Sequence, residues 1–209
     1  MELDEVLKLA DWPIILGEMT STYGEHFSQY SYTKYPAAKY QHFKDTFSAF
    51  AVNVEMESAL LWKWGHWGKA NYPTKQGALI AEISALWPEY LQWVDQLPEA
   101  PIPKTTFLWW GRHLGRLRYI TTAYLTHLIH PQEIPIIDQH NFRAMNHLLR
   151  IPSPKKKPSD WDDIAHLKSF LNKVVSRLPY SESDIDKYLM MYGRALKLRR
   201  SKSPIKEHA

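Results

Sequence analysis

The sequence predicts an all-α protein, and three observations support this. Of the 209 residues only 8 are glycine while 14 are proline, and 44% are hydrophobic. Apolar residues recur mostly at spacings of three, four and seven, and few stretches alternate polar with apolar residues. Prolines separate these runs, as expected between helices. A chain of this length can bury one sizeable core or two small lobes.

The first third of the chain is the least regular. Residues 4–10 are expected to form a short helix, and residues 14–36, rich in Ser, Thr and Tyr, are expected to form loops and short turns. Apolar residues over 37–64 keep a helical spacing, which predicts one long helix or two. Gly65 and Gly68 then end this segment.

The remaining helices are easier to place. Thr74 is the expected cap of a helix that meets Pro88 and continues for a further turn to Leu97. Ser159 precedes an amphipathic helix, and Ser183 is the expected cap of the last one. Three further helical runs are expected between these, at about 104–113, 119–130 and 138–150.

The domain organisation follows from these elements. Residues 1–195 are predicted to form one globular unit of two helical lobes. One lobe would combine residues 1–36 with 150–195, and the other would hold residues 37–149. The basic segment 196–209 lacks apolar spacing and is expected to be a flexible tail.

Composition excludes several classes of protein. The chain has no cysteine, which excludes disulfides, thiolate zinc sites, cysteine-ligated iron–sulfur clusters and a cysteine nucleophile. No apolar run reaches the roughly 20 residues needed to cross a bilayer. The acidic start is unlike a secretory signal. An intracellular, cytoplasmic protein without a membrane partner is therefore expected.

Positive charge is concentrated near the end of the chain. Residues 150–209 hold 14 Lys and Arg against 7 Asp and Glu, whereas residues 1–149 hold 12 against 15, so that +7 and −3 give the total of +4. A basic C-terminal third favours a polyanionic partner, and a solvated helix face with a basic tail is the alternative.

Asp138 is the main candidate for a functional side chain. Residues 134–149 read IPIIDQHNFRAMNHLL, in which an apolar stretch ends at Asp138 and an amphipathic run follows. Aspartate is a favoured helix N-cap, and its loss from such a position costs about 1 kcal/mol. The same place in the sequence also suits a carboxylate that is delivered to a cleft. Capping and catalysis are compatible, because one side chain can serve both.

The segment IIDQHNFRAMN resembles the aspartate segment of the helix-hairpin-helix DNA glycosylases of the endonuclease III type. Thr122 and Ala123 match the Thr-Ala that opens the second helix of the family's hairpin, at nearly the family's distance from the aspartate. The residues of the aspartate segment that match the family are Asp138, His140, Phe142 and Arg143.

The departures from the family pattern narrow the expected chemistry. The family's glycine-rich hairpin is replaced by GRLRYI (115–120), in which Arg116 and Arg118 would supply charge in place of backbone amides. The residue before Thr-Ala is a lysine in the members that cleave the strand, whereas here it is Thr121, which cannot form a Schiff base. The resemblance therefore implies a glycosylase without strand cleavage and without an iron–sulfur cluster.

The resemblance also implies a fold, a function and a partner. The fold would be the two-lobed helical fold of these DNA glycosylases, with a helix-hairpin-helix-like element. A damaged or mispaired base would be flipped out of double-stranded DNA and released by hydrolysis of its N-glycosidic bond, with Asp138 as the essential carboxylate. His140 and Arg143 would support the loop or the phosphates, and Thr121 would lie beside the sugar. The alternatives are an inactive nucleic-acid-binding protein of the same fold and a helical interaction scaffold.

Other residues are weaker candidates. A flipped base could stack on Trp62, Trp64 or Trp67, which could equally seal the contact between helices. His127 and His130 lie three residues apart and His140 follows soon after, so a His-His-Asp metal site with Asp138 can be drawn. No HExxH or comparable motif is present, however, and neither a metal nor a cofactor is expected. The basic side chains that could contact the DNA backbone, or simply line a solvated face, are Arg112, Arg116, Arg118, Lys155, Lys156 and Lys157.

Overall fold

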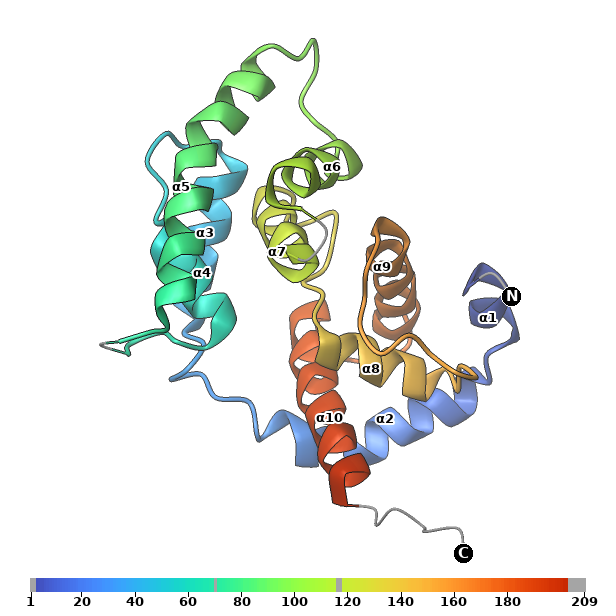
Figure 1. The fold of residues 1–209 in the computed structure, drawn as a ribbon. Coiled ribbons are helices and arrows are strands. Elements are labelled where there is room, and N and C mark those ends of the chain that lie inside the picture. Colours follow the sequence, from blue (N-terminus) through green and yellow to red (C-terminus); the bar gives the residue numbers. More distant parts are fainter. Residues whose placement is uncertain (1–2, 70, 116–117, 203–209) are drawn as a thin grey trace, which may run out of the picture. The chain divides into compact units, whose positions relative to one another are not determined.

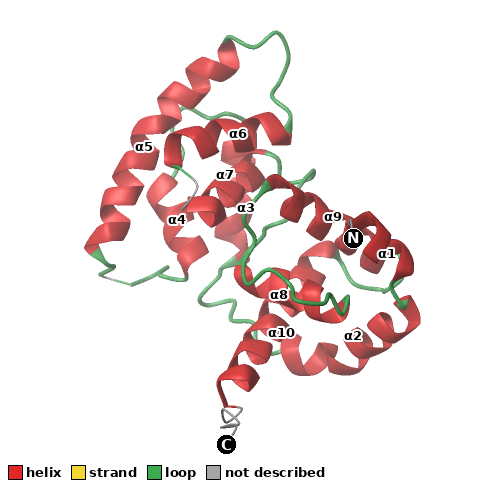
Figure 2. Cartoon of the chain, turned by 45° about the vertical axis from the view of Figure 1, so that its right-hand side comes forward, coloured by secondary structure: helices red, strands yellow, loops and turns green. Residues whose placement is uncertain are grey.

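The computed structural model describes residues 3–69, 71–115 and 118–202, and over these residues the chain is helical with no strand (Figures 1 and 2). The predicted all-α class is thereby confirmed. The helices are α1 (Leu3–Leu9), α2 (Trp12–Phe27), α3 (Ala37–Ser48), α4 (Met56–Trp64), α5 (Thr74–Asp95), α6 (Pro103–Leu114), α7 (Tyr119–Ile129), α8 (Gln139–Leu148), α9 (Trp161–Val175) and α10 (Glu182–Lys202).

The chain divides into two compact units. The first unit combines Met1–Tyr30 with Ile137–Ala209, and the second unit is Ser31–Ile136. Helices α1, α2, α8, α9 and α10 belong to the first unit, and α3 to α7 belong to the second. The segment that begins at Asp138, which sequence reasoning grouped with residues 37–149, thus belongs to the same unit as the two ends of the chain.

Helix α2 occupies a segment that was expected to form loops, and that prediction was wrong. Asp11 caps the helix through a hydrogen bond from the Ile14 N–H (3.3 Å), and Pro13 fits its first turn. Its buried face is narrow, with Ile15 and Met19 as its buried apolar residues. The polar and glycine-containing sequence lowers helix propensity, but packing of this narrow face overrides it.

Residues 37–64, for which one long helix or two were expected, form two helices, α3 and α4. Helix ends differ from expectation in two further places. Helix α5 begins at Thr74 with no side-chain cap and contains the exposed Pro88, which removes one helical hydrogen bond. Helix α10 is capped by Ser181, whose Oγ accepts from the Asp184 N–H (3.1 Å), rather than by Ser183.

The expected tail is partly helical. Helix α10 continues to Lys202, so residues 196–202 extend the last helix, and residues 203–209 lie outside the described part of the chain.

The first unit is organised around the crossing of α8 and α10. A Cβ placed on Gly193 of α10 would lie 1.9 Å from the carbonyl oxygen of His140 in α8, so only a glycine permits this approach. Arg143 reinforces the crossing, since its Nη1 donates to the Gly193 carbonyl oxygen at 2.9 Å. The crossing fixes the first turn of α8, where Asp138 and His140 lie.

The second unit is organised around α7. Every residue from 121 to 130 is buried, so the helix has no solvated face, and α3 and α6 pack against it. The polar side chains on α7 therefore need partners inside the protein. Thr126 donates to the Thr122 carbonyl oxygen at 2.8 Å, and two histidines, described below, bond to neighbouring segments.

The α8–α10 crossing predicts opposite effects for two Gly→Ala substitutions. Gly193→Ala should lower the free energy of unfolding by about 1–3 kcal/mol, because the new methyl group collides with the α8 backbone. Gly17→Ala, in the middle of α2 with open space around it, should raise it by up to about 1 kcal/mol. Urea unfolding followed by circular dichroism measures both. Equal stability of Gly193→Ala and the wild type would contradict the close crossing.

Candidate functional site

Asp138 is the N-cap of α8. Its Oδ1 accepts from the N–H groups of His140 (2.7 Å) and Asn141 (3.1 Å), and the Asn141 Oδ1 accepts in return from the Asp138 N–H (2.8 Å). Asn141 is also tied to α10, because its Nδ2 donates to Asp186 at 2.9 Å. The carboxylate is therefore held in one orientation by backbone groups and by a reciprocal cap.

Capping geometry alone does not distinguish Asp138 from other aspartates. Asp160 caps α9 with the same reciprocal arrangement, and the backbone angles of the two residues agree closely (φ −145°, ψ 177° and φ −144°, ψ 174°). Asp160, however, forms an ion pair with Lys155 at 2.8 Å. A functional role for Asp138 must therefore be argued from what surrounds it.

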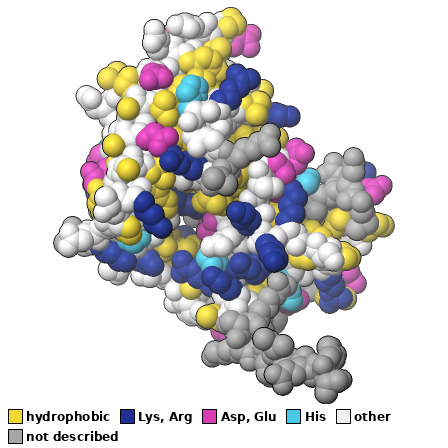
Figure 3. Space-filling model, in the orientation of Figure 1, with side chains coloured by type: hydrophobic (Ala, Val, Ile, Leu, Met, Phe, Trp, Pro, Cys, Tyr) yellow, Lys and Arg dark blue, Asp and Glu magenta, His cyan; other side chains and the backbone are white. Residues whose placement is uncertain are grey.

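The surroundings of Asp138 on the first unit are basic. Figure 3 shows Lys and Arg side chains gathered over α8 and α10. The pKa of His140 is lowered, first by burial and further by the charges of Arg194, Arg143 and Lys197, while Asp138 opposes the shift. The His140 Nδ1 accepts from the Arg143 Nη1 at 3.3 Å, which fits a neutral imidazole. The first turn of α8 thus combines a fixed carboxylate, a neutral histidine and several cations.

Among the predicted basic residues of the first unit, Lys155 differs from its neighbours. Its Nζ lies 2.8 Å from Asp160 and 3.1 Å from the buried Asp163, so much of its charge is already neutralised. Lys156 and Lys157 are exposed. Arg143, Lys155 and Lys156 line one common groove, which is analysed further below.

The remaining basic candidates belong to the second unit. Arg112 is exposed in the last turn of α6. Arg118 forms an ion pair with Glu82, so its guanidinium already has an acidic partner. Arg116 lies outside the described residues. Thr121, at the start of α7, is buried with 7% of its surface exposed.

The three tryptophan candidates are not equivalent. Trp62 is 5% exposed and stacks on Tyr40 and Tyr124, with ring centroids 4.7 and 6.2 Å apart, so a base could stack on it only if this core opened. Trp64 and Trp67 are partly exposed. The Lys39 Nζ lies 5.6 Å from the centre of the Trp67 ring.

The two histidines of α7 bind the loop that follows it. The His127 Nδ1 donates to the Ile134 carbonyl oxygen at 2.7 Å, and its Nε2 is therefore the acceptor for the Tyr40 hydroxyl. The His130 Nδ1 donates to Glu133 at 3.0 Å. Both rings thereby fasten residues 133–134 to the helices of the second unit.

His130 is also part of a buried chain of hydrogen bonds. Its Nε2 lies 2.8 Å from the Thr106 Oγ1, which lies 3.0 Å from the Tyr90 hydroxyl. Burial lowers the pKa of His130, and Glu133 only partly opposes this. Burial also raises the pKa of Tyr90 to about 12, so that both groups are neutral near pH 7.

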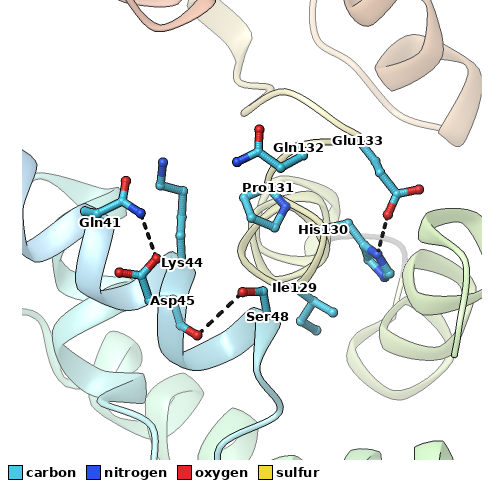
Figure 4. Close-up of a pocket in the computed structure, with 9 residues that line it drawn as sticks. All are labelled: Gln41, Lys44, Asp45, Ser48, Ile129, His130, Pro131, Gln132 and Glu133. Atoms are coloured by element: carbon cyan, nitrogen blue, oxygen red, sulfur yellow. Dashed lines mark hydrogen bonds and ion pairs between the residues drawn. The ribbon is translucent and has the colours of Figure 1, made fainter.

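A shallow pocket of about 230 Å³ lies between α3 and the turn at 130–133 (Figure 4). The side chains of His130 and Glu133 point away from those of Lys44 and Asp45 across the pocket. Asp45 accepts from the Gln41 Nε2 at 2.7 Å. The pocket walls are thus bonded among themselves, and within the described residues no group of three or more His, Cys, Asp or Glu is placed to hold a metal ion.

Sequence reasoning missed several residues of the basic surface. Arg194 and Lys197 act on His140 from α10, some 50 positions along the chain, so only the tertiary structure reveals them. The close helix crossing at Gly193 was weakly indicated by the sequence, because a glycine inside a helix costs about 1 kcal/mol and often marks close packing.

Comparison with known proteins yields no relative. Neither the known protein families, nor the curated proteins, nor the solved structures contain a match to this chain. None of the helices over the described residues is long and apolar enough to cross a membrane.

The buried His130 predicts that acid destabilises the protein. Because its pKa is lowered in the folded state, the unfolded chain binds more protons below the ordinary value of 6.5. The stability contributed by neutral His130 is thus present above that value and is lost as the pH falls toward the folded-state pKa. Unfolding free energies measured at about pH 7.5 and about pH 5.5 test this. His130→Gln should reduce the difference, whereas the control His166→Gln should retain it. An undiminished difference in His130→Gln would contradict the assignment.

Proposed function

We propose that this protein is a monofunctional DNA glycosylase, which hydrolyses the N-glycosidic bond of a damaged or mispaired base flipped out of double-stranded DNA. The observation that carries the proposal is the first turn of α8. Asp138, in the segment that resembles the aspartate motif, is held by two backbone N–H groups and has His140, Arg143 and the cations of α10 around it.

A fixed carboxylate suits this reaction. As the bond between the sugar C1′ and the base nitrogen breaks, positive charge develops on the sugar ring, much as in glycoside hydrolysis. Asp138 would stabilise this charge and accept a proton from the water that attacks C1′, while the base leaves with the electrons of the broken bond. Backbone N–H groups at a helix N-terminus favour the ionised form that both roles require.

The basic surroundings would serve binding. Arg143 and the exposed Lys156 and Lys157 would contact backbone phosphates and give a salt-dependent affinity. Thr121 carries no amine, so the reaction would end at an abasic site without strand cleavage.

Asp138→Asn is the sharpest test. Asparagine caps helices as well as aspartate does, so the fold should be retained, while the loss of charge should slow base release about 100-fold or more. Duplexes carrying a panel of deaminated, oxidised, alkylated and mispaired bases are incubated with the enzyme, and alkali then cleaves the abasic sites. Asp11→Asn is the matched control, because Asp11 caps α2 and should be dispensable. Borohydride should trap no covalent intermediate.

The alternatives make different predictions in the same assay. If the wild type binds DNA but leaves every lesion intact, the enzymatic proposal is wrong, and a nucleic-acid-binding protein of the same kind remains. If the wild type binds no DNA even at low ionic strength, the glycosylase and the nucleic-acid-binding hypotheses are both wrong, and the interaction scaffold remains.

A further inference from the structure

A basic groove runs along α8 and past its C-terminal end. Residues of α2, α8, α10 and the loop after α8 enclose a groove of about 710 Å³ in the first unit, called the α8 groove below. Arg143, which also bonds to His140 near Asp138, lines one part of it, and the loop after α8 lines the other. The charged lining of the groove consists of Arg143, Arg150, Lys155, Lys156 and a single acid, Glu18.

The one acid of the groove is already engaged. Glu18 accepts a hydrogen bond from the Tyr192 hydroxyl, and its Oε1 lies 3.7 Å from the His147 Nε2. The contacts of Glu18 are thus with Tyr192 of α10 and His147 of α8, and no ion pair joins it to the cations of the groove within the described residues. The groove keeps an excess of positive charge.

Two of the four cations have no partner among the residues that the structure describes. Arg143 donates to the Gly193 carbonyl oxygen, and Lys155 is paired with Asp160 and Asp163. The side chains of Arg150 and Lys156, by contrast, form no hydrogen bond or ion pair with any group in the described part of the chain. Two free cations beside two fixed ones are an arrangement that suits an anion with several charges.

The backbone at Arg150 is held in one conformation at the end of α8. Arg150 follows the end of α8 with φ of 52°, in the left-handed region, and the Ile151 N–H donates back to the Asn146 carbonyl oxygen at 3.0 Å. Glycine is the usual residue at this position of a helix end, because a side chain there costs about 1 kcal/mol. Phe50 ends α3 with the same turn, at φ of 51° and with the Ala51 N–H donating to the Thr46 carbonyl oxygen at 3.1 Å, so the turn fixes the backbone at Arg150 but does not by itself indicate a ligand.

Stabilisation of the helix end is the competing explanation for Arg150. A cation near a helix C-terminus gains about 0.3–1 kcal/mol from the helix dipole. That gain does not exceed the cost of the left-handed conformation, and it does not require a groove or a second free cation at Lys156. The combination favours a ligand.

We propose that the α8 groove binds the phosphate groups of a multiply phosphorylated ligand, with Arg150 and Lys156 as the residues that determine affinity. The phosphates could be successive groups of a nucleic-acid strand or those of a free polyphosphate. This inference uses the phosphate chemistry alone and does not depend on the reaction proposed for Asp138.

Arg150→Gly and Lys156→Ala test the groove, with Ser153→Gly as the control. Ser153 lies in the same loop with φ of 49°, so its replacement relieves the same kind of backbone strain without removing charge. The probes are a short labelled DNA duplex, followed by fluorescence anisotropy, and inorganic tripolyphosphate, followed by calorimetry. Each charge removal should weaken binding about 3- to 10-fold and lower the salt dependence (the slope of log K against log salt) by about one for the duplex. Ser153→Gly should bind like the wild type.

The outcomes separate the two phosphate sources and the two proposals. Duplex binding without tripolyphosphate binding identifies a nucleic-acid strand, and the reverse identifies a free polyphosphate. If the wild type binds neither probe, or if both charge variants bind as Ser153→Gly does, the groove proposal is overturned, even where base release is observed. If the charge variants bind weakly while no lesion is released, the groove proposal holds and the glycosylase proposal fails. Circular dichroism of each variant shows that a binding loss does not reflect unfolding.

Discussion

The α8 and α10 helices cross at a point where one of them has no side chain. Because Gly193 has no side chain, the α10 backbone contacts the α8 backbone directly at His140. This main-chain contact fixes the position of the first turn of α8. Arg143 bonds to the Gly193 carbonyl oxygen, and Asn141 bonds to Asp186, so polar contacts fasten the same turn to the same helix. The orientation of the Asp138 carboxylate, the basic surroundings contributed by α10, and the wall of the α8 groove all depend on this crossing.

In the second unit, the main constraint is the burial of polar side chains on α7. Helix α7 is buried on every side, which would be ordinary for an apolar helix, but it carries threonines and two histidines. His127 and His130 use their ring nitrogens to bond the loop after α7, at Ile134 and Glu133, and thereby hold in place the segment that leads to Asp138. Burial lowers the pKa of His130 more than its bond to Glu133 raises it, so the imidazole is held neutral and the burial that orders this part of the chain makes it sensitive to acid.

Part of this structure could be predicted from the sequence. The helices α6, α7 and α8 lie close to the expected ranges, because apolar spacing and capping residues are local signals. Asp138 was recognised as a cap for the same reason. Helix α2 was missed because its buried face is too narrow to stand out from its polar residues, and only its tertiary neighbours make it a helix.

The features of the site that could not be predicted are those that join distant parts of the chain. Nothing near Arg118 in the sequence indicates its ion pair with Glu82, and nothing near His140 indicates Arg194. The left-handed backbone of Arg150 could not be predicted either, because such a turn is usually recognised in a sequence by a glycine.

The left-handed turn at Arg150 has a consequence for the evolution of the protein. At position 150 the demands of folding and of ligand binding favour different residues: the backbone is best served by glycine, and the groove by a cation. A lineage that no longer needs the groove would be free to acquire glycine or asparagine there and gain stability, whereas one that still uses it would keep a basic residue at a constant cost. The identity of this single residue in homologous chains would therefore record whether the groove is still under selection.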